Sequence, residues 1–190
     1  MRWDPRLAGM LQLMGAALRP PPGKGRVALA LGMGIVTHLA FAGGVLAMMI
    51  AMFNGMSATF GRIPQPWAWG VNALLILQFP LVHSLLLTRR GGRWLSRLIP
   101  GPHGGTLATT TYALIAALQL LALFTLWTPS GIVWWRAEGM IFWIIVATYG
   151  LAWLMLTKAS FDAGVEVQSG ALGWMSLLAR IKPRFPDMPT

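Results

Sequence analysis

The chain has 190 residues, of which 56% are hydrophobic and only 11% are charged, and its mean hydropathy is +0.62. An average soluble domain carries about 25% charged residues, so this composition excludes a water-soluble globular protein. The net charge of +10 would suggest nucleic-acid binding in a soluble protein. Here insertion into a bilayer and contact with anionic lipid headgroups explain it better, and no nucleic-acid partner is expected. The absence of cysteine excludes disulfides, thiolate metal sites and a cysteine nucleophile.

Residues 1–26 form a basic N-terminal arm with a helical pattern of its own. Asp4 can cap a helix that begins at Pro5, and the prolines at 20–22 end it. Apolar side chains share one face of this helix: Trp3, Leu7, Met10, Leu11, Met14 and Leu18. The polar positions include Arg2, Arg6 and Arg19. This pattern predicts an amphipathic helix on the cytoplasmic leaflet with its arginines among the lipid headgroups; docking on a partner protein is the alternative.

Four long apolar segments follow between residues 27 and 157. We place helices at about 27–53, 67–87, 107–127 and 139–157. Each is close to the roughly 20 residues that cross a hydrocarbon core, and none has the polar stripe that a soluble helix needs. The sequence therefore predicts an all-α integral membrane protein with four transmembrane helices.

The positions of the lysines and arginines predict the orientation. Thirteen of the 15 lie in three segments: Arg2, Arg6, Arg19, Lys24 and Arg26 before the first span; Arg89, Arg90, Arg93 and Arg97 between the second and third; and Lys158, Arg180, Lys182 and Arg184 after the fourth. The other two loops contain only Arg62 and Arg136. By the positive-inside rule, both termini and the middle loop are expected to be cytoplasmic. We expect the membrane to be a bacterial inner membrane. Arg89, Arg90, Arg93 and Arg97 are expected to contact lipid headgroups.

Residues 158–190 are too polar to span the membrane again, since Asp162 and Glu166 interrupt the apolar pattern. Five apolar residues then fall on one helical face: Ala171, Trp174, Met175, Leu178 and Ile181. We expect a second interfacial helix here, followed by a proline-rich tail over residues 182–190.

Polar side chains within the predicted spans are the candidate functional residues, because such groups are costly in lipid. They are His38, Asn72, Gln78, His83 and Gln119. No carboxylate is among them, which disfavours an ion or proton pathway and a hydrolase.

The two intramembrane histidines are weak candidates for metal or haem ligation. Counting at about 1.5 Å per residue from Arg26 and Arg89 places His38 at roughly 18 Å and His83 at roughly 9 Å from the inner face. That difference disfavours joint ligation, although His83 alone remains a possible ligand of a metal or pigment. The simpler interpretation is that each histidine hydrogen-bonds a neighbouring helix.

A resemblance to a known family rests on short motifs between residues 78 and 135. They are His83-Ser84, a basic loop, Thr111-Tyr112, Leu126-Trp127-Thr128-Pro129 and Val133-Trp134-Trp135. Their order resembles the membrane part of bacterial methanethiol S-methyltransferases and NnrU proteins, distant relatives of isoprenylcysteine carboxyl methyltransferases. The resemblance extends from about residue 71 to the end of the chain.

The resemblance implies transfer of a methyl group from S-adenosylmethionine to a small or lipophilic acceptor. In that family the cofactor-binding motifs follow the part that this chain resembles, so no cofactor residue can be assigned here. We expect these 190 residues to be non-catalytic unless a further C-terminal region or a partner supplies the cofactor site. The alternative is an accessory or assembly subunit of a larger membrane complex, in contact with other subunits and with a pigment, haem or lipid.

Overall fold

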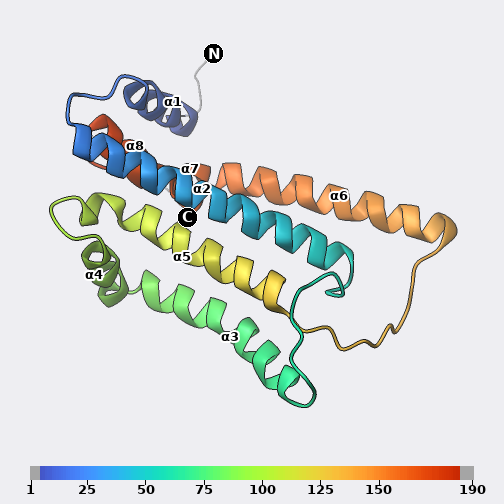
Figure 1. The fold of residues 1–190 in the computed structure, drawn as a ribbon. Helices are drawn as coiled ribbons and strands as arrows, with labels where there is room; N and C mark the ends of the chain where they lie inside the picture. Colours follow the sequence, from blue (N-terminus) through green and yellow to red (C-terminus); the bar gives the residue numbers. More distant parts are fainter. Residues whose placement is uncertain (1–4, 185–190) are drawn as a thin grey trace.

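The computed structural model describes residues 5–184, which form eight helices (Figure 1). In chain order these are α1 (Pro5–Ala17), α2 (Lys24–Phe53), α3 (Trp67–Leu87), α4 (Arg89–Leu98), α5 (Gly104–Leu126), α6 (Gly139–Asp162), α7 (Val165–Gln168) and α8 (Ala171–Ala179). The helix begins at Pro5 as predicted, whereas Trp3, Asp4 and the last residues of the proline-rich tail lie outside the described range.

Four of these helices, α2, α3, α5 and α6, are long and apolar enough to cross a membrane, which confirms the predicted number of spans over the described residues. The bounds of α3 agree with the prediction, and those of α2 and α5 differ by a few residues. The fourth helix continues past residue 157 to Asp162. An ion pair between Lys158 and Asp162, one turn apart, supports this extra turn at an exposed position.

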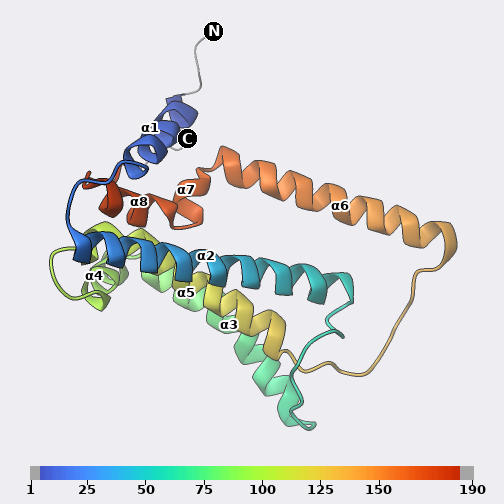
Figure 2. The same cartoon turned by 45° about the horizontal axis from the view of Figure 1, so that its top comes forward.

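The centre of the bundle is α5, which packs along α2 on one side and against α3 and α4 on the other (Figures 1 and 2). Small residues permit the close approach of α2 to α5. A Cβ atom at Gly44 would lie 3.0 Å from the carbonyl oxygen of Ala117, so a larger residue at this position would force the helices apart.

The basic middle segment forms α4, a short helix at the end of the bundle where α2 and α5 begin. Thr88 caps it, its hydroxyl accepting a hydrogen bond from the Gly91 N–H. Leu95 is buried against the bundle, whereas Arg89, Arg90, Arg93 and Arg97 are all exposed. We call this end of the molecule, with α1, α4 and α8, the α8 end.

The C-terminal helix α8 packs into the bundle more deeply than the sequence predicted. It contacts α1, α2 and α5, and six of its nine residues are buried. Of the expected apolar face only Leu178 is buried; Ile181 is 45% exposed. A helix therefore lies where the apolar pattern predicted one, but other helices cover it: the small residues Gly173, Ser176 and Ala179 bring a second face of α8 onto its neighbours, and Trp174 and Met175 of the expected face are partly buried against the core.

The N-terminal helix α1 lies on α8 (Figure 2). Leu13 and Ala17 are buried, whereas four residues of the predicted apolar face are between 39% and 82% exposed: Leu7, Leu11, Met14 and Leu18. Met10 and Met14 of that face also line a cavity that α8 helps to form, so the face is only partly open.

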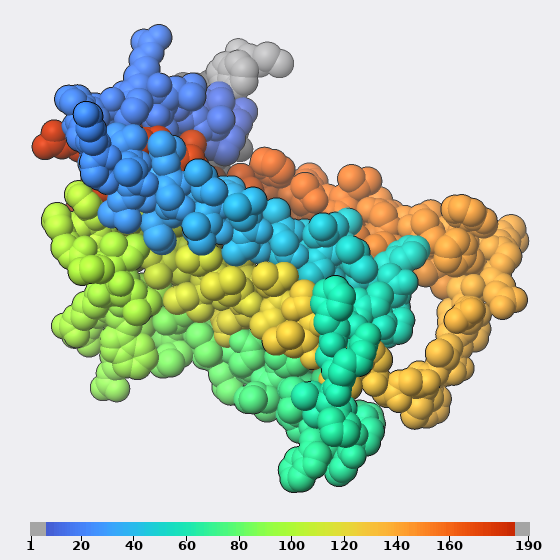
Figure 3. Space-filling model, in the orientation of Figure 1, coloured from blue at the N-terminus to red at the C-terminus, as the bar shows by residue number. Residues whose placement is uncertain are grey.

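The fourth long helix, α6, stands apart from the other three (Figure 1), and none of its residues is buried. Figure 3 shows residues 127–138 as an arm that leads away from the bundle to the start of α6. One hydrogen bond ties the helix to α2, from the Tyr149 hydroxyl to the carbonyl oxygen of Met49 at 2.8 Å, beside a contact between the Tyr149 and Phe53 rings. The apolar surface of α6 is thus open to lipid or to other protein.

Candidate functional site

Three polar contacts join α3 to the α5 segment along the bundle, and four of the five predicted intramembrane residues take part in them. The first is at the end opposite α8. The buried Asn72 donates from Nδ2 to the Thr128 carbonyl (2.8 Å) and accepts from the Thr128 N–H at Oδ1 (3.0 Å). Both amide functions of Asn72 are therefore used to hold the chain where it leaves α5.

The second contact pairs Gln78 with Gln119 near the middle of the two helices. Gln119 Nε2 donates to the side-chain oxygen of Gln78 at 2.6 Å and to its carbonyl oxygen at 2.9 Å. Gln78 Nε2 donates in return to the Gln119 carbonyl at 3.1 Å. These bonds satisfy both side-chain amide nitrogens and tie α3 to α5, whereas Oε1 of Gln119 is buried without a hydrogen-bond partner.

The third contact involves His83 on α3. The Tyr112 hydroxyl on α5 lies 2.7 Å from Nε2 of His83, and the ring of Phe79 stacks on the imidazole with centroids 5.2 Å apart. The prediction that this histidine hydrogen-bonds a neighbouring helix is confirmed. Among residues 5–184, no group of three or more His, Asp or Glu side chains lies close enough together to bind a metal ion.

His38 behaves differently from His83. Its Nδ1 bonds to the carbonyl of Gly34 in its own helix at 2.8 Å, and the ring meets Trp174 of α8 edge-on with centroids 5.9 Å apart. The expectation of a hydrogen bond to a neighbouring helix is therefore wrong for His38.

The two histidines lie beside the same turn of α5, on different sides of it. A Cβ atom at Gly170 would meet Thr110 and Ala113 of α5 and Thr37 of α2, while Tyr112 contacts His83. Arg26, from which the depth of His38 was counted, donates to the carbonyls of Leu177 and Leu178 at the end of α8. The expected difference in depth between the two histidines stays a prediction.

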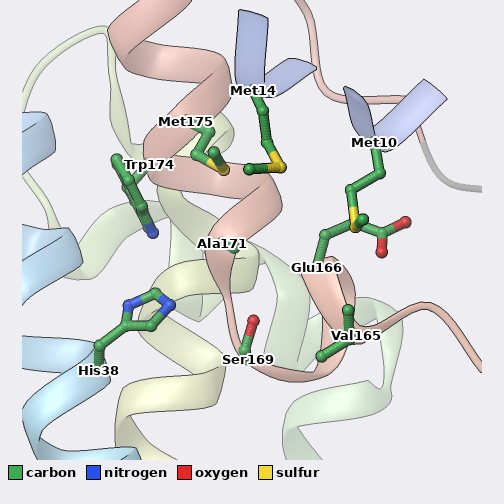
Figure 4. A pocket seen from close by; sticks show the side chains of 9 residues that line it. All are labelled: Met10, Met14, His38, Val165, Glu166, Ser169, Ala171, Trp174 and Met175. Atoms are coloured by element: carbon green, nitrogen blue, oxygen red, sulfur yellow. The ribbon is translucent and has the colours of Figure 1, made fainter. Parts of the chain in front are cut away.

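A cavity of about 200 Å³ lies beside His38, between α1, α2 and the α7–α8 segment (Figure 4). We call it the His38 pocket. Its lining is Met10, Met14, His38, Val165, Glu166, Ser169, Ala171, Trp174 and Met175. Most of this lining is apolar, and three of the nine side chains are methionines.

Four polar side chains line the His38 pocket: those of His38, Trp174, Ser169 and Glu166. Because a carbonyl can only accept, the bond to Gly34 requires a hydrogen on Nδ1 of His38 and leaves Nε2 of the neutral imidazole as an acceptor. Trp174 Nε1 is buried and has no hydrogen-bond partner. Figure 4 shows the indole nitrogen directed toward the His38 ring. A donor and an acceptor thus face one small apolar cavity.

The ring of Trp174 is held against α2 by Gly34. A Cβ atom at position 34 would lie 2.8 Å from the indole, so any larger residue there would displace the ring. Gly34 of the first span therefore leaves the space into which the side chain of Trp174, from the C-terminal part of the chain, packs.

The cavities do not fit a nucleoside-bearing methyl donor such as S-adenosylmethionine. A second cavity of about 280 Å³ lies next to the first, between α1 and the α6–α7 junction. Cofactor and drug-sized ligands occupy pockets of about 300–1,000 Å³. Among the described residues neither cavity reaches that size, so no residue is assigned to the cofactor.

The apolar helix faces predicted from the sequence include Met10, Met14, Ala171, Trp174 and Met175, but none of these residues was assigned to a pocket, and Val165 and Ser169 were not named. The signal that points to them is the pair of glycines around α7: Gly164 and Gly170 have φ values of +84° and +75°, which fold α8 back onto the bundle. Of the arginines expected at lipid headgroups, Arg19 and the four of α4 are exposed. Arg2 lies outside the described residues, and nothing is described of the Arg6 side chain.

Comparison with known proteins relates the chain to one group of membrane enzymes. A Pseudomonas sp. methanethiol S-methyltransferase is 34% identical over 102 residues, which is 52% of this chain and 37% of the relative. The chain resembles methanethiol S-methyltransferases. Methanethiol S-methyltransferase 2 of Bradyrhizobium diazoefficiens is 31% identical over 85 residues (45% of this chain, 31% of the relative), and that of Crocosphaera subtropica is 31% identical over 84 residues (44% and 31%).

These matches confirm the resemblance predicted from the motifs, over about half of the chain and at 28–34% identity. The chain spans about a third of the length of the curated relatives it matches. No protein-family model and no solved structure matches it. The relatives and the four apolar helices together indicate a multi-pass membrane protein similar to the membrane portion of a methyltransferase.

Proposed function

We propose that this chain is the membrane platform of an enzyme that transfers a methyl group from S-adenosylmethionine to the sulfur of a small or lipophilic thiol. The observation that carries the proposal is the 31–34% identity of about half the chain to several methanethiol S-methyltransferases. Because the described cavities are smaller than the cofactor, we place the cofactor in a further region or a partner and regard these 190 residues as non-catalytic alone.

The proposed orientation puts the α8 end on the cytoplasmic side of a bacterial inner membrane. The basic residues support this orientation, because Arg19, Arg26 and the arginines of α4 all lie at that end. Anionic headgroups are the proposed partners of α4, whose arginines flank the exposed Trp94 and Leu98. The outward apolar face of α1 suits the same interface.

A second candidate function is that of an accessory subunit of a larger membrane complex. The observation that favours it is α6, a long apolar helix with no buried residue. A membrane partner could pack along this helix without displacing any described element.

The test is a methylation assay on membranes from cells that express the complete reading frame with its neighbouring genes. We expect isotope from methyl-labelled S-adenosylmethionine to appear in dimethyl sulfide when methanethiol is added. The purified 190-residue chain should give none, and membranes that lack the gene serve as the control. If the complete frame does not methylate the thiol while the chain co-purifies with other membrane proteins, the accessory role replaces the proposed one.

A further inference from the structure

We propose that the His38 pocket binds the methyl acceptor as a small uncharged thiol and that His38 takes the proton from its sulfur. The inference rests on the proposed function and gives the acceptor a place and a set of residues. Its basis is the volume of the pocket, its lining, and the polar atoms of His38 and Trp174.

The size and the lining favour a small, soft, uncharged ligand. A cavity of about 200 Å³ accommodates a compound of a few heavy atoms and excludes a nucleoside. Met10, Met14 and Met175 present polarizable thioether sulfurs, and Trp174 presents an aromatic ring. Such groups make favourable contacts with sulfur and can adapt to ligands of slightly different shape.

The polar atoms of His38 and Trp174 can hydrogen-bond the ligand both as a thiol and as a thiolate. Nε2 of His38 is the acceptor toward which an S–H can point, since Nδ1 already donates to Gly34. When the S–H bond breaks, an N–H bond forms at Nε2 and the imidazole becomes an imidazolium. The sulfur is then a thiolate, the nucleophilic form, and the unpartnered Nε1–H of Trp174 can donate to it.

Glu166 is the other titratable group in the lining. Figure 4 shows its carboxylate beside Met10, across the pocket from the His38 ring. His38 is therefore the group placed to take the proton next to the indole.

The binding test uses the purified chain in lipid nanodiscs, with 13C-methyl methionine and 15N-imidazole labels read by NMR. The probes are methanethiol and dimethyl sulfide, which has a similar shape but no S–H. Both should saturably shift the methyl signals of Met10, Met14 and Met175. Only methanethiol should move the Nε2 signal of His38 toward the protonated form, because dimethyl sulfide has no proton to give.

Two phenylalanine substitutions, one within α1 and one directly after it, provide the matched comparison. Met14→Phe narrows the pocket and should weaken binding by about tenfold or more. Leu18→Phe adds a ring at a position that is 82% exposed and should leave the affinity unchanged. Equal affinity in Met14→Phe, equal shifts of all twelve methionines, or an unprotonated His38 with methanethiol bound would each overturn the inference.

The two proposals fail in different ways. Methanethiol binding in the pocket with no methyl transfer by the complete reading frame would overturn the proposed function and support the pocket as a thiol site. Methyl transfer that His38→Gln leaves at the wild-type rate would overturn the role of His38 while the proposed function stands.

Discussion

Replacing Gly173 by leucine is expected to detach α8 from the bundle. A Cβ atom at this position would lie 2.4 Å from Oγ1 of Thr110, 2.7 Å from Oγ1 of Thr109 and 2.9 Å from the Thr106 carbonyl oxygen. The Thr106 carbonyl belongs to the backbone, and turning the Thr110 hydroxyl away would break its hydrogen bond to the Gly170 carbonyl, so we expect the helix to move away. Overpacking of this kind costs about 1–3 kcal/mol, and a whole leucine side chain at a helix contact should lie at the upper end.

The measurement is thermal unfolding of the purified chain in detergent, together with limited trypsin cleavage after Arg180. Gly173→Leu should lower the unfolding temperature and speed cleavage. Gly150→Leu is the control, because that glycine lies within α6 and a Cβ there would meet nothing within 4 Å. Equal unfolding temperatures for the two variants would contradict the close packing of α8 on α5.

Replacing Arg26 by alanine is expected to weaken the attachment of α8 to the segment that precedes α2. The Arg26 guanidinium donates to the carbonyls of Leu177 and Leu178, and at 2.5 Å to that of Pro21. These bonds satisfy the last carbonyls of α8 and tie the segment before α2 to it. Loss of a charged donor to partly buried acceptors should cost about 1–3 kcal/mol.

Arg26→Lys should recover only part of that loss, since an ammonium cannot reproduce the planar fork that reaches several carbonyls together. Arg19→Ala is the matched control, because Arg19 is exposed and lies close by in the chain. Unfolding temperatures again measure the effect. A wild-type value for Arg26→Ala would show that α8 is held without this residue.

The spans could be predicted from the sequence because their signals are local. Length, apolar composition and charge-free intervals decide whether a segment can cross lipid, and α3 even begins and ends at the predicted residues. The sequence identified four polar residues that need hydrogen-bond partners within the bundle, but not which residues these partners are: Asn72, Gln78, Gln119 and His83. Lipid forces such groups to find hydrogen bonds, yet which residue provides each bond depends on the packing of α3 on α5.

The α8 end of the molecule was not predictable in the same way. A short apolar face has the same sequence pattern whether lipid or protein covers it, so the deep packing of α8 on the bundle could not be predicted. The pocket depends on contacts between residues far apart in the chain, such as that of Trp174 with Gly34.

We propose a four-span bundle whose α8 end, with the His38 pocket, faces the cytoplasm. Since the chain has no cysteine, single cysteines can be introduced without background and labelled with a membrane-impermeant maleimide. The four exposed positions Leu18, Ser57, Ser130 and Lys182 are suitable. In intact spheroplasts we predict labelling at Ser57→Cys and Ser130→Cys, and at Leu18→Cys and Lys182→Cys only after lysis. Labelling of Leu18→Cys or Lys182→Cys in intact spheroplasts would contradict the proposed orientation and the place of the pocket within it.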